Sequence, residues 1–273
     1  MSIIFKSLSS GSCGNSYFLG STDENGKAVA GIVIDTGVSV RRMKDELSRC
    51  GITPDDIGGI LLTHDHMDHI RSLGSWCKRL SKPVWSTEVL RKVLSRHTLA
   101  GGTYFSACSR VLAPDTWNEI VPGHVLARFF EVPHDASQTV GYAIVIDGYR
   151  FVIMTDIGKM TTEALQWAAH ADTVVIESNY DLDMLMNGSY TWDLKMRIRS
   201  GHGHLRNEEC ADAVRQFVHP GLKNIFLCHL SENNNTPEKA FDASAAVLQE
   251  LGLTGEIALR ALPRQTASPL FRL

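Results

Sequence analysis

The chain has 273 residues, enough for one large domain or two small ones. Hydrophobic residues make up 44% and charged residues 21%, a balance typical of globular proteins, and no apolar run approaches the ~18 residues that would cross a bilayer. The net charge of −3 excludes a global positive field that would draw the whole chain onto nucleic acid or a membrane, so a nucleic-acid contact would require a local basic patch.

Cysteine usage points to a reducing compartment. The six cysteines are widely spaced and include no C-x-x-C pair, which excludes both a disulfide framework and a zinc knuckle. The first eight residues contain one lysine and no long apolar run, which is not typical of a signal peptide. We therefore expect a cytoplasmic protein without a membrane partner, and the sequence leaves its oligomeric state open.

In the N-terminal half, hydrophobic residues alternate between the period of strands and that of helices, which indicates mixed α and β structure. Predicted strands cover 3–8, 16–20, 29–34, 59–62 and 83–86. Predicted helices cover 39–50, 68–80 and 87–95. Ser39 is a typical helix cap, and Gly51 a typical helix end.

The C-terminal half continues the same alternation. Predicted strands cover 125–132, 140–147, 150–154, 173–177, 224–228 and 256–260. Predicted helices cover 162–169, 207–218 and 236–251, with Asn207 expected to cap the second of them. No linker rich in Pro, Gly or Ser interrupts the chain, so we expect a single domain over 1–273.

Polar residues follow several predicted strands directly. They are Asp35, His64, His134, Asp156 and His229. Strand ends that present polar side chains at one rim are the usual way in which α/β scaffolds build active sites.

The strongest motif is Thr63-His64-Asp65-His66-Met67-Asp68-His69, which has the pattern H-x-H-x-D-H. In extended backbone, positions i and i+2 point the same way, so His64 and His66 can share one ion. Asp68 and His69 begin the next helix and can point at another. The chain cannot easily wrap all four around one tetrahedral metal, so the spacing predicts two adjacent ions that need further ligands from elsewhere.

These motifs, in this order, resemble those of the metallo-β-lactamase superfamily of hydrolases, over nearly the whole chain. The resemblance implies a four-layer αβ/βα sandwich, with two mixed β-sheets flanked by helices and a metal site on one edge. It implies one ion held by His64, His66 and His134, and a second held by Asp68, His69 and His229. Asp156 would bridge the two ions, and Asp35 would orient a ligand histidine.

Residue types at these positions narrow the resemblance. True β-lactamases more often have cysteine where Asp156 falls, and flavodiiron oxidoreductases replace the histidine at His66 with glutamate. Only 72 residues separate Asp156 from His229. That interval is too short for the large inserted domain of β-CASP nucleases.

Further segments resemble the YycJ/WalJ group of bacterial proteins, which is associated with exonuclease action on DNA. They are 10–16, 177–181, 203–208 and 229–234. Within them we expect substrate contacts from Asn15, Asn179, Arg206, Asn207 and Ser231. Arg206 stands where the group is expected to have serine, and an arginine suits phosphate binding.

The resulting hypothesis is a dinuclear phosphodiesterase that acts as a DNA exonuclease. A hydroxide between two divalent cations (Zn, Mn or Fe) about 4 Å apart would attack phosphorus. Asp68 and His204 are the expected catalytic residues, with His204 contacting the phosphate or protonating the leaving group. The basic stretch Lys195, Arg197, Arg199 and Arg206 could follow a nucleic-acid backbone, although a solvated helix face would show the same pattern.

Three alternatives stay open at this point. A small-molecule hydrolase of the same fold would act on a cyclic phosphodiester, a thioester or a lactone. An iron-dependent dioxygenase would hold one ion with vacant positions. A binding module on an inactive scaffold would have lost ligands, whereas this ligand set is complete.

Overall fold

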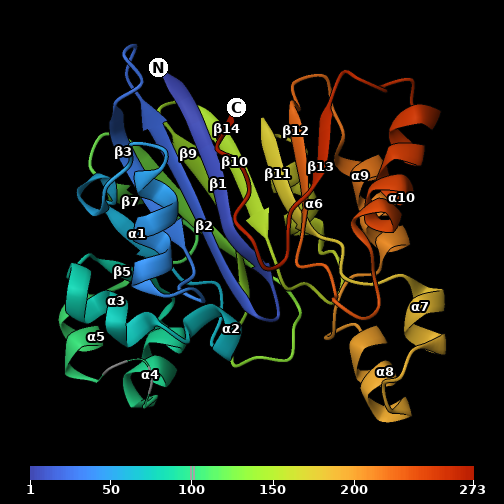
Figure 1. Cartoon of the computed structure of the whole chain (residues 1–273), viewed down its shortest axis with the longest axis horizontal. Coiled ribbons are helices and arrows are strands. Elements are labelled where there is room, and N and C mark those ends of the chain that lie inside the picture. Colours follow the sequence, from blue (N-terminus) through green and yellow to red (C-terminus); the bar gives the residue numbers. More distant parts are fainter. Residues whose placement is uncertain (99, 101) are drawn as a thin grey trace.

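The computed structural model describes residues 1–98, 100 and 102–273. Two β-sheets stack face to face, and helices cover the outer face of each (Figure 1). The predicted four-layer α/β sandwich is confirmed. None of the helices in these ranges is both long enough and apolar enough to cross a membrane.

The first sheet has seven strands in the order β14-β1-β2-β3-β4-β5-β6. They are β1 (Ser2–Gly11), β2 (Gly14–Thr22), β3 (Ala28–Ile34), β4 (Gly59–Leu61), β5 (Val84–Ser86), β6 (Ser109–Val111) and β14 (Phe271–Arg272). The pairs from β14 to β3 are antiparallel, and those from β3 to β6 are parallel.

The second sheet repeats this design, in the order β13-β12-β11-β10-β9-β8-β7. Its strands are β7 (Asn118–Val121), β8 (Val125–Glu131), β9 (Val140–Ile146), β10 (Tyr149–Met154), β11 (Thr173–Glu177), β12 (Asn224–Cys228) and β13 (Ala258–Ala261). It is antiparallel from β7 to β10 and parallel from β10 to β13.

The helices fall into two groups along the chain. The first is α1 (Val40–Ser48), the short 3-10 turn η1 (Pro54–Asp56), α2 (Met67–Ile70), α3 (Leu73–Leu80), α4 (Glu88–Arg96) and α5 (Thr103–Cys108). The second is α6 (Thr162–Ala168), α7 (Leu182–Asn187), α8 (Trp192–Arg199), α9 (Asn207–Phe217) and α10 (Pro237–Glu250). The sequence did not predict α5, α7, α8 or the strands β6, β7 and β14.

Two predicted helix boundaries were wrong. The helix expected over 68–80 is divided into α2 and α3, because the Ser72 N–H donates to the Thr36 carbonyl instead of continuing the helix. The N-cap of α9 is Arg206, whose N–H donates to the Glu209 carboxylate, so Asn207 is the first helical residue and not the cap.

Three apolar cores hold the layers together. Alternate residues of a strand face opposite sides of a sheet, so in β1 Phe5 joins the core between the sheets, and Ile4 joins the core beneath α1 and α3. A third core lies between the second sheet and α6, α9 and α10. Both faces of both sheets are therefore buried, which fixes the strand register and with it the positions of the residues at the strand ends.

Candidate metal centre

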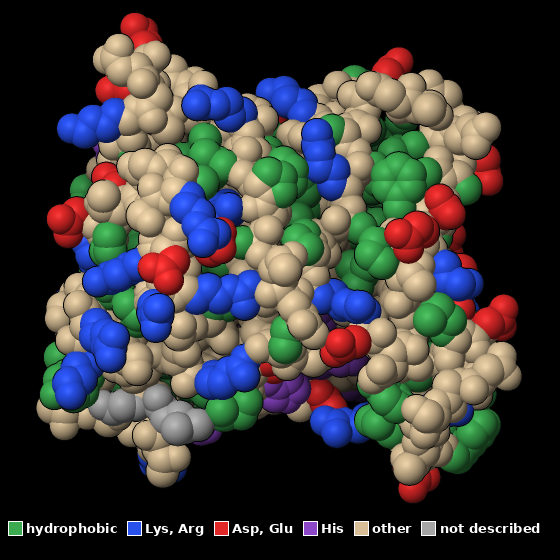
Figure 2. All heavy atoms as spheres, viewed as in Figure 1, with side chains coloured by type: hydrophobic (Ala, Val, Ile, Leu, Met, Phe, Trp, Pro, Cys, Tyr) green, Lys and Arg blue, Asp and Glu red, His purple; other side chains and the backbone are tan. Residues whose placement is uncertain are grey.

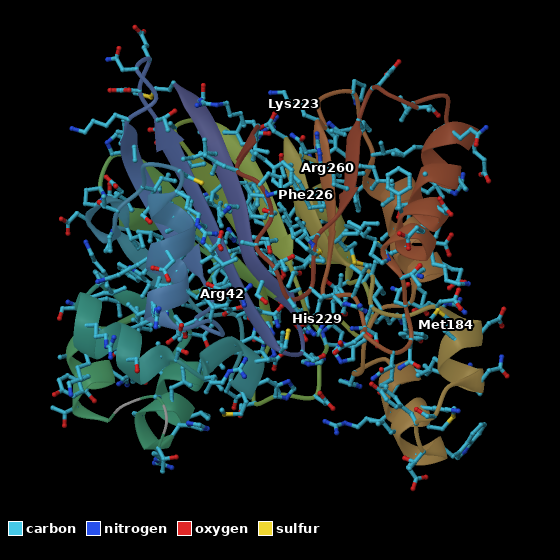
Figure 3. The ribbon with its side chains drawn as sticks, in the orientation of Figure 1. Arg42, Met184, Lys223, Phe226, His229 and Arg260 are labelled. Carbon is cyan, nitrogen blue, oxygen red and sulfur yellow. The ribbon has the colours of Figure 1, made fainter. Side chains whose placement is uncertain are left out.

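The predicted site residues meet at one end of the two sheets. Asp35 and His64 follow the parallel strands β3 and β4, while Asp156 and His229 follow β10 and β12. Carboxyl ends of parallel strands form the usual binding edge of α/β proteins. Figure 3 labels His229 at the lower end of the second sheet, facing the tip of the β1–β2 hairpin.

One ligand group consists of His64, His66 and His134, whose candidate ligand atoms all lie within 4.8 Å of one another. His66 is the N-cap of α2. The Nδ1–H of His134 donates to the Gly203 carbonyl over 2.8 Å, which leaves its Nε2 3.3 Å from His66 Nδ1. Loops from both sheets thus contribute to this group.

A second group consists of Asp68, His69 and His229, again with ligand atoms within 4.8 Å. Asp156 lies between the groups. Its Oδ2 is 3.1 Å from His69 Nε2, and its Oδ1 is 3.7 Å from His134 Nε2. One carboxylate therefore reaches both groups, which is the arrangement that two ions sharing a ligand require.

The buried carboxylate of Asp35 fixes the first sheet's side of the site. Its Oδ2 accepts from His69 Nδ1 at 2.7 Å and from the Thr63 hydroxyl at 2.8 Å, while its Oδ1 accepts from the Thr63 N–H. Because Nδ1 donates its proton to Asp35, Nε2 is the nitrogen of His69 that would bind an ion. A Cβ at Gly37 would collide with the Asp68 carbonyl and the Asn15 backbone, so only glycine allows this close packing.

Glu177 holds two histidines on the second sheet's side of the site, as Asp35 holds His69, and the sequence analysis assigned it no function. Its Oε1 accepts from His204 Nδ1 at 2.7 Å and from His229 Nδ1 at 2.9 Å. Its Oε2 accepts from the N–H groups of Ile157 and Leu205. The available signal was a charged residue ending the apolar run of β11, at the same rim as the other strand-end residues.

The electrostatics of the site reflect the close packing of imidazoles and carboxylates. Burial works against a charged His69, but attraction to Asp156 and Asp35 outweighs it and raises the pKa of His69 to about 10. Burial and repulsion from His69 lower the pKa of His64 well below its usual value. Burial alone would raise the pKa of Asp156, but His229 and His69 hold that pKa well below the usual range.

The donor set fits divalent cations. Within the described part of the chain, the buried Nε2 atoms of His64 and His229 have no hydrogen-bond partner. Buried polar atoms are seldom left unpaired in proteins, and both nitrogens belong to candidate ligand groups, where a bound metal would take their lone pairs. Imidazole and carboxylate ligands are compatible with zinc, manganese or iron. The buried clusters are thus consistent with a dinuclear metal site.

A cavity of about 390 Å³ opens onto both ligand groups. His204, Asn179 and Ser231 line it on the metal side, and Tyr190 and Leu194 line it from the α8 side. Its volume lies near the lower end of the range for small-molecule sites. It therefore has room for about one nucleotide and not for a longer piece of substrate.

Of the five residues expected to contact substrate, two line the cavity and three do not. Asn179 and Ser231 line the cavity. Asn15 is fully buried, and its Nδ2 lies 2.9 Å from both Asp68 Oδ2 and His69 Nε2, so it supports the ligands. Asn207 is buried in hydrogen bonds with Ser178 and Asn235, away from the cavity. Arg206 is not among the residues that line the cavity either, because its side chain turns to the carboxylates of α9.

The expected basic stretch does not form a row of free cations. Lys195 is only 8% exposed, and its Nζ donates to the carbonyls of Met186 and Gly188. Arg197 lines the cavity but pairs with Asp135 at 2.5 Å. Arg199 contacts the Met186 sulfur. The sequence shows how many cations lie close together along the chain, but it does not show these partners, which only the fold brings to them.

The fold and this site define a class of protein. Residues 31–229 match the family described as beta-lactamase superfamily domain. The chain belongs to the metallo-β-lactamase superfamily.

Among curated proteins, the chain is 30% identical over 265 residues to exodeoxyribonuclease WalJ of Streptococcus pneumoniae, covering 96% of this chain and 95% of that one. It is 31% identical to exodeoxyribonuclease YycJ of Bacillus anthracis, covering 92% and 91%. Among solved structures, the metallo-β-lactamase fold protein YhfI of Bacillus subtilis superimposes with a TM-score of 0.71 at 13% identity, over 98% of this chain and 99% of that one. At that identity the likeness shows the fold alone.

Proposed function

We propose that this protein is a dinuclear metal-dependent phosphodiesterase that degrades DNA as an exonuclease. One observation carries the proposal: the Asp156 carboxylate lies within 3.7 Å of a histidine of each candidate ligand group, and a histidine held by a buried glutamate lines the same cavity. The relatives named as exodeoxyribonucleases support DNA as the substrate. The cytoplasm, where the six free cysteines would stay reduced, is the proposed location.

In this proposal His64, His66 and His134 hold one ion, Asp68, His69 and His229 hold the other, and Asp156 serves both. Two divalent cations would acidify a water nucleophile and neutralise charge on the phosphate. Asp68 lines the cavity and would accept the proton from the water that attacks the phosphate.

His204 supplies the proton that the departing sugar oxygen needs. Its Nδ1 is bound to Glu177, which fixes the ring and leaves Nε2 as the atom that can exchange a proton with substrate. His204 is 22% exposed and lines the cavity, so it can reach a group bound there. Asn179 and Ser231 offer hydrogen bonds to the same group.

A small phosphodiester is the second candidate substrate, because the cavity itself has room for about one nucleotide. The dioxygenase alternative requires one ion with vacant positions, and the second ligand group of Asp68, His69 and His229 argues against it.

One-domain organisation over 1–273 remains our expectation.

The test is degradation of end-labelled single- and double-stranded DNA by protein loaded with Mn²⁺ or Zn²⁺. Asp156→Ala should abolish the activity, while Asp172→Asn, a carboxylate remote from the metals, should leave it intact. The product ladder reports the direction of cleavage. Absence of cleavage by protein shown to hold two metals would favour the small phosphodiester instead.

A further inference from the structure

One region beside the metal centre has a very uneven charge. Residues 69–114 contain one carboxylate, Glu88, against eight Lys and Arg side chains, although the whole chain has a net charge of −3. The eight are Arg71, Lys78, Arg79, Lys82, Arg91, Lys92, Arg96 and Arg110. We call residues 69–114 the basic region. Figure 2 shows Lys and Arg side chains gathered at the lower left, where Figure 1 draws α3, α4 and α5.

Among the described residues, six of these eight cations have no carboxylate partner, and four of the six also lack a bond to a backbone carbonyl. Arg91 and Lys92 pair with Glu88. Arg71 and Arg110 donate to backbone carbonyls. Among the described residues, no carboxylate lies within ion-pair distance of the remaining four, which are Lys78, Arg79, Lys82 and Arg96. An unneutralised group of cations at a surface attracts a polyanion.

Helix stability alone does not explain the pattern. Lys78 and Arg79 occupy the last turn of α3, where cations favour the helix dipole. That explanation would also place acids in the first turns, as α6 to α10 do, but α3 and α5 have none there. Lys82 also lies outside any helix. The lack of acids is therefore a property of the region and not of its individual helices.

The basic region adjoins the metal centre at two points. Its first residue, His69, is a candidate ligand, and α3 follows α2 after two residues. At the start of α4, the Thr87 hydroxyl donates to the Gln138 side chain at 2.5 Å, in the loop that carries His134. A DNA strand that left the cavity on this side would therefore meet the basic region.

We infer that the basic region binds the sugar–phosphate backbone of the DNA strand beyond the nucleotide held at the metals. The inference rests on the proposed function and deepens it. The cavity has room for about one nucleotide, so the rest of the strand must lie outside it. The cations on the opposite side, around α8 and α9, are largely paired. In the basic region only Arg91 and Lys92 pair with a carboxylate among the described residues, so the other cations can meet phosphates.

The test is the salt dependence of DNA binding by the metal-loaded protein. The probe is a fluorescent single-stranded oligodeoxynucleotide with nuclease-resistant phosphorothioate linkages, titrated between about 50 and 200 mM KCl. In the triple variant Lys78→Gln, Arg79→Gln and Lys82→Gln, the slope of log affinity against log salt should fall by about two, at ~0.7 per lost phosphate contact. Affinity at the lowest salt should fall about tenfold or more.

Two matched variants separate charge from folding. The triple variant Lys78→Arg, Arg79→Lys and Lys82→Arg keeps the charges and should keep the wild-type slope. Neutralising Lys27, Lys223 and Arg272 instead should also keep it, since Figure 3 labels Lys223 at the end of the sheets opposite to His229. Hydrolysis of bis(4-nitrophenyl) phosphate, which is too small to reach the basic region, should be unchanged in all three.

The outcomes distinguish this inference from the function on which it rests. A wild-type slope in the Lys78/Arg79/Lys82 neutral variant, with DNA cleavage intact, would overturn the basic region alone. An equal loss in the Lys27/Lys223/Arg272 variant would also overturn it. Salt-sensitive binding that needs the basic region, without any metal-dependent cleavage of DNA, would instead contradict the proposed function.

Discussion

The two helical regions that flank the metal centre differ in the balance and the pairing of their charges. The basic region has eight Lys and Arg against one acid, while residues 177–256 have seven against twelve. In 177–256, Arg206, Arg215 and Lys239 pair with carboxylates of the same region. Figure 2 shows Asp and Glu side chains more often on that side. A run of cations in a sequence becomes a positive surface only where carboxylates are absent in space.

This comparison also assigns different tasks to the two regions. Residues 177–256 contain His204 and Glu177, which meet over 2.7 Å at the cavity. Beyond the candidate ligand His69 at its edge, the basic region places no described residue among those that line the cavity, but it has unpaired cations. We therefore expect changes in 177–256 to affect the chemical step or the fold, and changes in the basic region to affect DNA binding.

The largest effect should come from the residue between the two regions. Asp156→Asn should lower kcat on DNA and on bis(4-nitrophenyl) phosphate alike, by about 10³-fold or more, because in the proposed site both ions would share its carboxylate. Metal content, measured by mass spectrometry, should fall as well. The salt slope of DNA binding should remain, since the basic region is untouched. A variant that kept both its metals and its rate would contradict the role given to Asp156.

Removing the proton donor should have a smaller and more selective effect. His204→Ala should lower kcat on DNA by roughly 10²-fold, within the range of general acid catalysis. Hydrolysis of bis(4-nitrophenyl) phosphate should change much less, because 4-nitrophenolate departs without a proton. Glu177→Gln should add to this selectivity a loss on both substrates, since Glu177 holds both His204 and the candidate ligand His229. Equal losses on both substrates would mean that His204 acts in binding or in structure.

A variant of Lys195 shows whether a cation of 177–256 can be removed without a change in DNA binding. Its Nζ joins the end of α7 to α8 through the carbonyls of Met186 and Gly188. Lys195→Met should reduce the free energy of unfolding by about 1–3 kcal/mol, because two carbonyls lose their donor. Thermal unfolding and the DNA salt slope, measured on one preparation, should show a lower Tm with the slope unchanged. A reduced slope would contradict this prediction and would mean that Lys195 contributes to DNA binding.

The smallest expected effect is on the stability of the fold at acidic pH, through a carboxylate of 177–256. Burial would raise the pKa of Asp181, but the N–H of Met184 and the Lys239 ammonium lower it below its usual value. This carboxylate therefore stabilises the fold above its unfolded pKa, and the contribution is lost as the pH falls through the lower folded value. Asp181→Asn keeps the helix cap but should flatten this part of the profile. Unfolding curves at pH values from about 2 to 6 provide the check.

The strand-end pattern made much of the site predictable. Runs such as Val174-Val175-Ile176 are local signals, and predicted strands that run in the same direction place the residues after them at one rim. The cluster from His64 to His69 is also local, because its ligands lie within one turn of loop and helix. The family resemblance added His134, Asp156 and His229 to the expected ligands. The structure brings all seven candidates together.

What the sequence did not predict depends on distant contacts. Glu177 gains its role only because His204 and His229 reach it from 27 and 52 residues away. Arg206 and Asn207 were expected at the substrate, but the carboxylates of α9 and the side chain of Asn235 hold them elsewhere. The short helices α7 and α8 have weak apolar patterns, and they depend on tertiary contacts such as the one made by Lys195.

The path of the DNA strand is the central claim, and cross-linking tests it most directly. A single-stranded oligodeoxynucleotide with a photoreactive group on one backbone phosphate, a few nucleotides from the end held at the metals, would be bound to the metal-loaded protein and irradiated. Peptide mass spectrometry would then locate the adduct. We predict adducts within residues 72–96. Adducts confined to residues 181–199 would contradict the account, because they would place the strand over α7 and α8.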